Sequence, residues 1–393
     1  MSTNAFSAQN FSLVLGGPLF QLFRRAHLSG DALELLNRRI IIIAGIAWIP
    51  LLLLTILAGT AFGGAVEIPF IEDVESHVRF LVALPILIGA ELIVHRRLRP
   101  AVSQFIERRI VTPEDTPKFE RAIESTLRLR NSPMTEILLI LIVYSIGIWV
   151  WIKQFSLGAA SWYAIPDGTR MRLTPAGYWF VFVSVPIFQF ILLRWYFRFF
   201  LWFYFLFRVS RLNLKLIPIH VDRTGGLGFL GTSTHAFAPI LVAQGAILAG
   251  LIAGQILHAG AVLTDFRVQV VAFLAFFIVA TLLPLTVFAP RLAEAKRAGL
   301  GAFGRLASRY GSRFEGKWLH DSSTDDELLG SGDIQSLADL GNSFGVVQEM
   351  RLFPFGWRDV TRLASMTAIP FLPLLLTIFS LEEFASYVLK AIF

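Results

Sequence analysis

Five side chains in this sequence are of types that bind metal ions or transfer protons. Glu91 and His95 are four residues apart, so on a helix they share one face. His220, Asp222 and His235 lie in a later stretch that we expect at the same membrane depth. Histidine and carboxylate together hold divalent metals or relay protons. The same residue types also form polar belts near lipid headgroups, so metal binding, proton or ion relay and an interfacial belt remain alternatives.

A stripe of basic residues is a second candidate site. At about 100° per residue, Arg194, Arg198, Arg208 and Lys215 fall within about 100° of one another on one predicted helix, and Arg211 lies at the edge of this stripe. Such residues anchor a helix when their charged ends reach lipid phosphates. The alternative is a basic wall along the path or binding site of an anion.

The loop 218–236 is rich in glycine, threonine and serine. Its clustered glycines are Gly225, Gly226 and Gly228. Glycine permits positive φ, so the loop could present backbone N–H groups to an anion beside Arg223. The alternative is a tight turn in which Asp222 and Arg223 make local hydrogen bonds. The loop matches neither the phosphate-binding loop nor the dinucleotide fingerprint.

Several classes of chemistry lack the residues they need. The chain has no cysteine, which excludes disulfides, thiolate metal sites and cysteine nucleophiles. Its seven histidines include no closely spaced pair, so the histidine boxes of membrane di-iron enzymes are missing. There is no serine–histidine–acid order and no zincin motif. We therefore expect no metal centre and no cofactor, and favour a protein that is not an enzyme.

The elements that must position these residues are membrane-spanning helices. The 393 residues are 55% hydrophobic, and the apolar residues gather in blocks of about 20, the length that crosses a bilayer. The net charge of +7 suits loops that face anionic lipid. No basic run accompanies a nucleic-acid-binding motif, so we expect no nucleic acid partner. Seven spans are predicted, at 40–62, 79–98, 136–156, 177–207, 237–262, 267–290 and 366–390.

The distribution of lysine and arginine predicts the orientation of the spans. The loop 96–135 carries nine basic residues, 208–236 carries four and 291–364 carries ten. The alternate loop 63–78 has none, and 157–176 has only two. Basic loops remain on the cytoplasmic side, so we expect a cytoplasmic N-terminus.

The predicted fold is therefore an all-α integral membrane bundle of about seven transmembrane helices with a helical cytoplasmic layer. Its parts are a cytoplasmic N-terminal segment, six helices with their loops, a cytoplasmic helical region and a last helix, at 1–39, 40–290, 291–364 and 365–393. In the cytoplasmic region, residues 291–318 are predicted to continue the sixth span, and Asp333 to begin another helix. Apolar residues at helical spacing also predict a helix over 117–130.

Two motifs resemble signatures of a group of uncharacterised bacterial multi-pass membrane proteins. The first runs from His220 to Leu230 (HVDRTGGLGFL) and the second from Asp333 to Ser343 (DIQSLADLGNS). The group has proline where this chain has Val221. The resemblance covers most of the chain from about residue 208 onward. It implies a bacterial inner membrane and carries no activity, so no functional residue is transferred from it.

Polar residues within several spans favour a transport or channel function, for a small ion or anion. Two other classes remain: a membrane-embedded enzyme acting on a lipid or membrane-bound substrate, and a non-catalytic signalling or scaffold protein. The expected partners are the lipid bilayer and the transported ion, and a homo-oligomer is left open.

Overall fold

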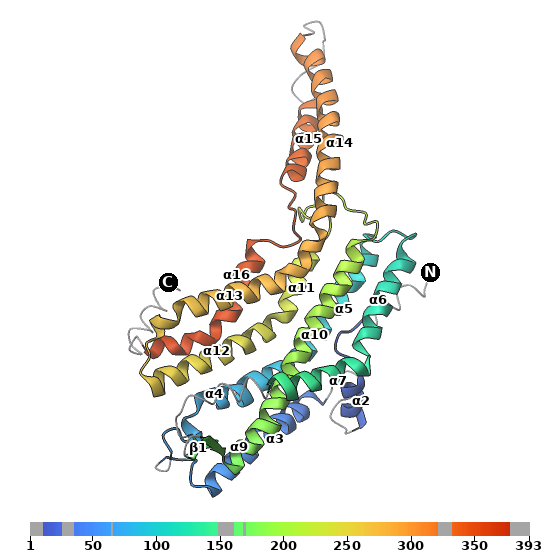
Figure 1. Ribbon diagram of the computed structural model, residues 1–393. Helices are drawn as coiled ribbons and strands as arrows, with labels where there is room; N and C mark the ends of the chain where they lie inside the picture. The colour runs from blue at the N-terminus through green and yellow to red at the C-terminus, as the bar shows by residue number, and fades with distance from the viewer. Residues whose placement is uncertain are drawn as a thin grey trace.

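The computed structural model describes residues 11–25, 35–63, 66–147, 161–167, 170–320 and 332–377. Its regular elements are helices, apart from one short β-hairpin (Figure 1). The last part of the predicted third span, 148–156, and of the seventh, 378–390, lie outside the described residues, as do 1–10 and 26–34 of the N-terminal segment.

Within this part of the chain, six helices are long and apolar enough to cross a membrane, or seven if one bent pair is a single span. The six are Leu36–Leu57, Val74–Glu107, Pro175–Ser210, Phe229–Ala259, Leu263–Leu319 and Trp357–Thr377. The bent pair joins Thr116–Arg130 to Pro133–Gly147 at 47°. The predicted all-α bundle of about seven membrane helices is confirmed, although the helix predicted over 117–130 forms part of the bent pair.

The chain order of the elements is as follows. The α-helices are α2 (Pro18–Arg25), α3 (Leu36–Leu57), α4 (Val74–His77), α5 (Leu84–Glu107), α6 (Thr116–Arg130), α7 (Pro133–Ile142), α9 (Pro175–Trp179), α10 (Val185–Ser210), α11 (Phe229–Ser233), α12 (Ala238–Ala259), α13 (Arg267–Leu282), α14 (Ala289–Glu315), α15 (Gly332–Gln348) and α16 (Trp357–Ala368). Short 3₁₀ or π segments join or extend them: η1 (Phe70–Glu72), η2 (Val78–Ala83), η3 (Val143–Gly147), η5 (Phe180–Ser184), η6 (Thr234–Phe237), η7 (Leu263–Phe266), η8 (Leu283–Phe288), η9 (Gly316–His320) and η10 (Ile369–Thr377).

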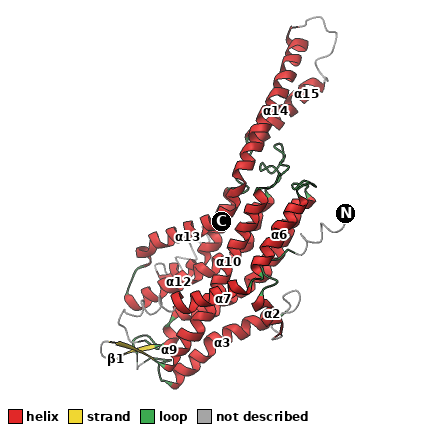
Figure 2. Ribbon diagram, turned by 45° about the vertical axis from the view of Figure 1, so that its right-hand side comes forward, coloured by secondary structure: helices red, strands yellow, loops and turns green. Residues whose placement is uncertain are grey.

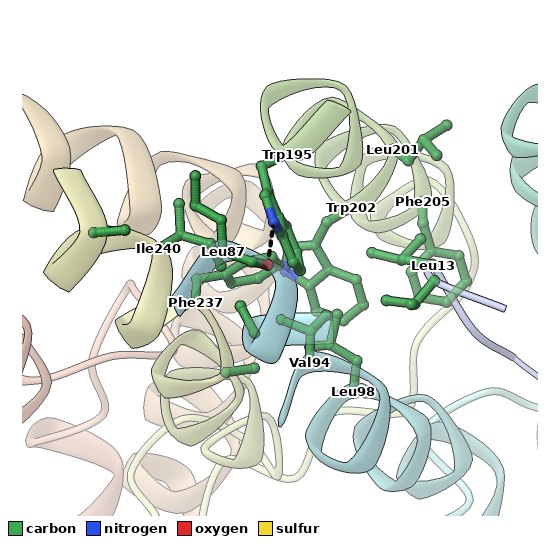
Figure 3. Close-up of a cluster of buried hydrophobic side chains, with 14 of the residues drawn as sticks. Leu13, Leu87, Val94, Leu98, Trp195, Leu201, Trp202, Phe205, Phe237 and Ile240 are labelled. Atoms are coloured by element: carbon green, nitrogen blue, oxygen red, sulfur yellow. Dashed lines mark hydrogen bonds between the residues drawn. The ribbon is translucent and has the colours of Figure 1, made fainter. Parts of the chain in front are cut away.

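The main apolar core lies between α5 and α10. Large side chains of α10, among them Trp195 and Trp202, are buried against Val94 and Leu98 of α5 (Figure 3). The Trp195 indole N–H donates to the Leu87 carbonyl oxygen at 2.9 Å. Because an indole N–H buried without a partner would cost free energy, this bond favours one register of α10 along α5.

Helix α12 packs at the centre of a second group of helices. A Cβ added at Gly250 would lie 3.1 Å from Cβ of Val78 in η2, and one at Gly245 would lie 2.5 Å from the Thr367 carbonyl oxygen in α16. The small residues therefore allow neighbouring helices on two sides to approach closely.

Helices α14 and α15 form an antiparallel hairpin that projects away from the bundle (Figures 1 and 2). Helix α14 continues the sixth span, as predicted, and α15 begins beside Asp333. The Asp333 carboxylate accepts from Trp318, and its carbonyl oxygen accepts from Tyr310 at 2.9 Å, which ties α15 to the end of α14. The helical region predicted over 291–364 thus includes a hairpin that projects from the bundle.

The opposite end of the bundle carries an antiparallel pair of strands, β1 (Ala164–Asp167) and β2 (Arg170–Leu173), which the sequence pattern does not predict. Trp162 packs under this hairpin and donates from its indole to Asp73 at 2.9 Å. Four-residue strands give too short an alternating pattern to stand out between apolar spans.

Candidate functional site

The Glu91 carboxylate lies in a buried ion-pair group between three helices. Arg198 of α10 donates to one carboxylate oxygen at 2.7 Å, and Arg39 of α3 donates to the other. Only 8% of Glu91, 3% of Arg198 and 1% of Arg39 is exposed. A buried charge is tolerated when it is paired and hydrogen-bonded, and both carboxylate oxygens meet this condition.

A second ion pair adjoins this group. It involves Arg194, which lies one helical turn before Arg198 on α10. Arg194 lies 3.8 Å from the carboxylate of Glu136, which comes from α7. Arg194 and Arg198 are four residues apart, so one face of α10 presents both guanidinium groups. Arg130, at the end of α6, borders the same small cavity as Glu136, Arg194 and Arg198.

We call these six residues the arginine cluster. Its members are Arg39, Glu91, Arg130, Glu136, Arg194 and Arg198. With four guanidinium groups and two carboxylates, the cluster has more positive than negative charge. The bend between α6 and α7 brings Arg130 and Glu136 to the same place, because Pro133 begins α7 and favours a new helix there.

Residues 11–17, which we call the N-terminal strap, cover this cluster. Phe11, Leu13 and Val14 are as buried as core residues, and Leu13 shares an apolar cluster with Phe205 (Figure 3). The Ser12 carbonyl oxygen accepts from Arg130. Just after the strap, the Leu19 backbone N–H donates to Glu136 at 2.8 Å.

Glycine is required where the strap passes the cluster. Gly16 has φ of +141° and Gly17 of +90°, conformations that residues with a Cβ rarely adopt. A Cβ at Gly16 would lie 2.3 Å from the Arg130 guanidinium, and one at Gly17 would lie 3.2 Å from a Glu136 carboxylate oxygen. Both glycines therefore permit the backbone to lie directly on the charged groups.

The space left inside the cluster is small. Leu13 of the strap closes a cavity of about 10 Å³ together with residues of α6, α7 and α10. This volume is about the least that holds one water molecule, so an oxyanion does not fit beside the present side chains. The site as described is closed.

His95 faces the strap. Its Nδ1 lies 3.0 Å from the Ser12 hydroxyl, which also accepts from the backbone N–H groups of Val14 and Leu15. Glu91 and His95 thus share a face of α5, as predicted, but they have different partners.

The glycine loop forms a separate site. The Asp222 carboxylate accepts hydrogen bonds from the backbone N–H groups of Thr224 at 2.8 Å, Gly226 at 3.1 Å and Gly228 at 2.8 Å. His220 lies 2.9 Å from the same carboxylate. Burial raises the pKa of Asp222, but the three N–H groups and His220 outweigh it, so the pKa is below the ordinary value. The backbone N–H groups that the sequence suggested for an external anion therefore bind the carboxylate of Asp222.

The remaining candidates lie apart from the arginine cluster. His235 lies 3.3 Å from the carboxylate of Asp359 in α16. Arg223 pairs with Glu349 at 2.9 Å near the base of the α14–α15 hairpin. Arg208 is exposed and stacks on Tyr204, so the predicted basic stripe divides into two buried and several outer residues. Among the described residues, no three histidine or carboxylate side chains meet as metal ligands would.

Sequence reasoning missed Arg39, Arg130, Glu136 and the strap as parts of the site. Arg130 is one of the nine basic residues of the loop 96–135, whose charge predicts only the orientation, and Arg39 is the last residue of the predicted N-terminal segment. A signal was present: Glu91, a carboxylate within an apolar span, requires a cationic partner from another helix. The sequence offers many arginines near that depth and does not specify which of them it is.

Comparison of the chain with protein-family models, with curated proteins and with solved structures finds no match.

Proposed function

We propose that the protein is a membrane transport or channel protein for a small anion, and that the arginine cluster is its anion site. One observation supports this most directly. Three buried guanidinium groups, from Arg39 of α3 and from Arg194 and Arg198 of α10, lie against two carboxylates inside a bundle of apolar helices, and the half-buried Arg130 of α6 borders the same cavity. Charged residues at this depth are costly, and those that occur commonly mark ion pathways.

The chemistry of the cluster suits an anion that has lost water. Removing an ion from water costs several kcal/mol even after the protein relaxes. A guanidinium at about 4 Å returns about 4 kcal/mol at an effective dielectric constant of 20. The planar fork of arginine also matches oxyanions in two-point contacts that lysine does not reproduce.

The two acceptor groups over the cluster would then be internal substitutes for the anion. The Ser12 carbonyl oxygen accepts a hydrogen bond from Arg130. The Glu136 carboxylate lies 3.8 Å from the Arg194 guanidinium, a distance longer than that of a direct hydrogen bond. An entering anion would displace the strap from Arg130 and Glu136 from Arg194. The two contacts that hold Glu91 are shorter, so Glu91 would remain as the fixed negative charge.

We further propose that the chain lies in a bacterial inner membrane with the strap and the α14–α15 hairpin on the cytoplasmic side. The basic residues of α14 support this orientation, since positive loops are retained in the cytoplasm.

Two single-cysteine variants test the orientation. Ser308→Cys lies on α14 and Thr264→Cys at the other end of the same helical run, and both positions are exposed. In intact cells, an impermeant thiol reagent should label Thr264→Cys only. Labelling of Ser308→Cys instead would reverse the orientation.

Anion flux in proteoliposomes tests the function. Wild type should carry chloride or phosphate, Arg194→Lys should carry less, and Arg194→Gln least. Arg208→Lys, on the same helix but exposed, is the matched control and should retain wild-type flux. Absence of flux from sealed wild-type proteoliposomes would contradict transport. Equal flux from all variants would keep transport and remove the arginine cluster from its path.

A further inference from the structure

An aromatic groove lies on the opposite side of α10 from the arginine cluster. It encloses about 460 Å³ between α10 and α13. The side chains that dominate it are Tyr196, Phe199, Phe200, Phe203, Phe276 and Phe277. This volume and this composition are typical of a small-molecule site, with few polar groups among apolar walls.

The groove exists because α13 diverges from α10. Helix α10 packs against the 3₁₀ segment η8, where Pro284 interrupts the regular helical hydrogen bonds. Beyond this point α13 turns away from α10 (Figure 1). Phe200 is 51% and Phe276 is 65% exposed, so the groove opens to the outside of the bundle.

A polar pair borders one end of the groove. The Tyr196 hydroxyl accepts from the Gln244 side-chain amide of α12 at 2.6 Å, and Gln244 is buried. The wall is therefore apolar where it faces outward and has its own polar groups satisfied at the base. Nothing in it requires a polar ligand.

At the other end of the groove, two aromatic rings in contact lead to the guanidinium of Arg211. Phe203, in the groove wall, stacks on Phe207 with ring centroids 6.3 Å apart. The Arg211 guanidinium lies 4.8 Å from the centroid of the Phe207 ring. Arg291, at the start of α14, donates to the neighbouring Ser210 carbonyl oxygen at 3.4 Å. One continuous face of α10 thus runs from an apolar groove to Arg211, and Arg291 of α14, which also pairs with Glu294 at 3.3 Å, lies beside its end.

We infer that this face is a specific binding site for one anionic phospholipid. Both walls belong to helices that cross the membrane, so the groove is filled from the bilayer. Tyr196 and Arg211 are about 22 Å apart along α10, and one leaflet of hydrocarbon is about 15 Å thick. An acyl chain in the groove would therefore place its phosphate beside Arg211 and Arg291. This site does not depend on the proposed anion transport.

The test is native mass spectrometry of the full chain with phosphatidylglycerol or phosphatidylcholine of the same chain length. Wild type should retain one phosphatidylglycerol in preference to phosphatidylcholine. Ala280→Trp fills the groove and should lose both lipids, whereas Ala275→Trp, exposed on another face of α13, should bind as wild type does. Arg211→Gln should lower the preference for phosphatidylglycerol about fivefold, the effect of one arginine at a membrane surface.

Three results would overturn the site. They are equal retention by Ala280→Trp and wild type, equal binding of the two lipids by wild type, and displacement of phosphatidylglycerol by inorganic phosphate. The last would show that the arginines bind a free anion and that the groove is not involved. Circular dichroism of each variant confirms that a lost lipid does not reflect a lost fold.

Discussion

The carboxylate of Glu91 lies 2.7 Å from the guanidinium of Arg198, although the two residues are 107 positions apart in the sequence. Arg39 donates to the other oxygen of the same carboxylate. The contact between α5 and α10 therefore depends on a charge pair as well as on the aromatic core around Trp195.

Replacing Glu91 with glutamine should strongly destabilise the protein. The change leaves the buried guanidinium of Arg198 without the carboxylate that it bonds, a loss of about 3–5 kcal/mol. Glu294→Gln is the control, because Glu294 pairs with Arg291 on the surface, where an ion pair contributes about 0–1 kcal/mol. Thermal unfolding in detergent measures both. A Glu91→Gln protein as stable as Glu294→Gln would show that the cluster does not need its fixed negative charge.

The strap should move when an anion binds. The chain has no native cysteine, so Leu13→Cys, at a site that is 2% exposed, reports on the strap alone. Its labelling by a maleimide should be slow, and chloride or phosphate should accelerate it, because an anion at Arg130 displaces the Ser12 carbonyl. Leu22→Cys, at a site that is 58% exposed, should label rapidly with or without anion.

Two outcomes of the labelling experiment would contradict the proposed opening of the strap or the proposed transport. Anion-independent labelling of Leu13→Cys in protein that carries flux would show that the strap is not a gate. Anion-dependent labelling without flux would leave an anion-binding site and remove transport.

Gly250→Leu should destabilise the bundle by about 1–3 kcal/mol, since extra methylene groups in a packed interior force neighbours to shift. The added side chain would meet Val78, whose Cβ is 3.1 Å from the position of a Cβ at Gly250. Gly254→Leu on the same helix is the matched control, because no atom lies within 4 Å of its Cβ position. Equal melting temperatures of the two variants in detergent would contradict the central position of α12.

Asp222→Asn should destabilise the glycine loop by about 1–3 kcal/mol at pH 7, because hydrogen bonds to an ionised carboxylate are the stronger kind. The folded-state pKa of Asp222 lies below its unfolded value, so its ionised form stabilises the fold above the unfolded pKa. This contribution is lost as the pH falls through the folded pKa.

The difference in stability between wild type and Asp222→Asn should therefore shrink below about pH 4. Asp339→Asn, at an exposed position on α15, should show no such dependence. If the difference in stability between wild type and Asp222→Asn stayed constant from pH 7 to pH 3, the negative charge of Asp222 would not be what stabilises the loop.

The sequence by itself determined the helical membrane architecture, because span length and apolar content follow from bilayer thickness and need no knowledge of packing. It also determined local features, such as the shared face of Glu91 and His95 and the turn chemistry around Asp222. These depend on residues within a few positions of one another, whose relation a helix or a glycine-rich turn already fixes.

Only the tertiary structure decided which charges meet. Glu91 could have been paired with several arginines near its depth, and the choice of Arg39 and Arg198 depends on how α3 and α10 are rotated against α5. The burial of the strap and the bend that brings Glu136 to Arg194 are equally long-range. Such contacts arise from the packing of whole helices, in which one residue of rotation moves a side chain by about 100° around the axis. For this reason the sequence predicted only a shared membrane depth for His220, His235 and Glu91, whereas the structure gives each of them a different partner.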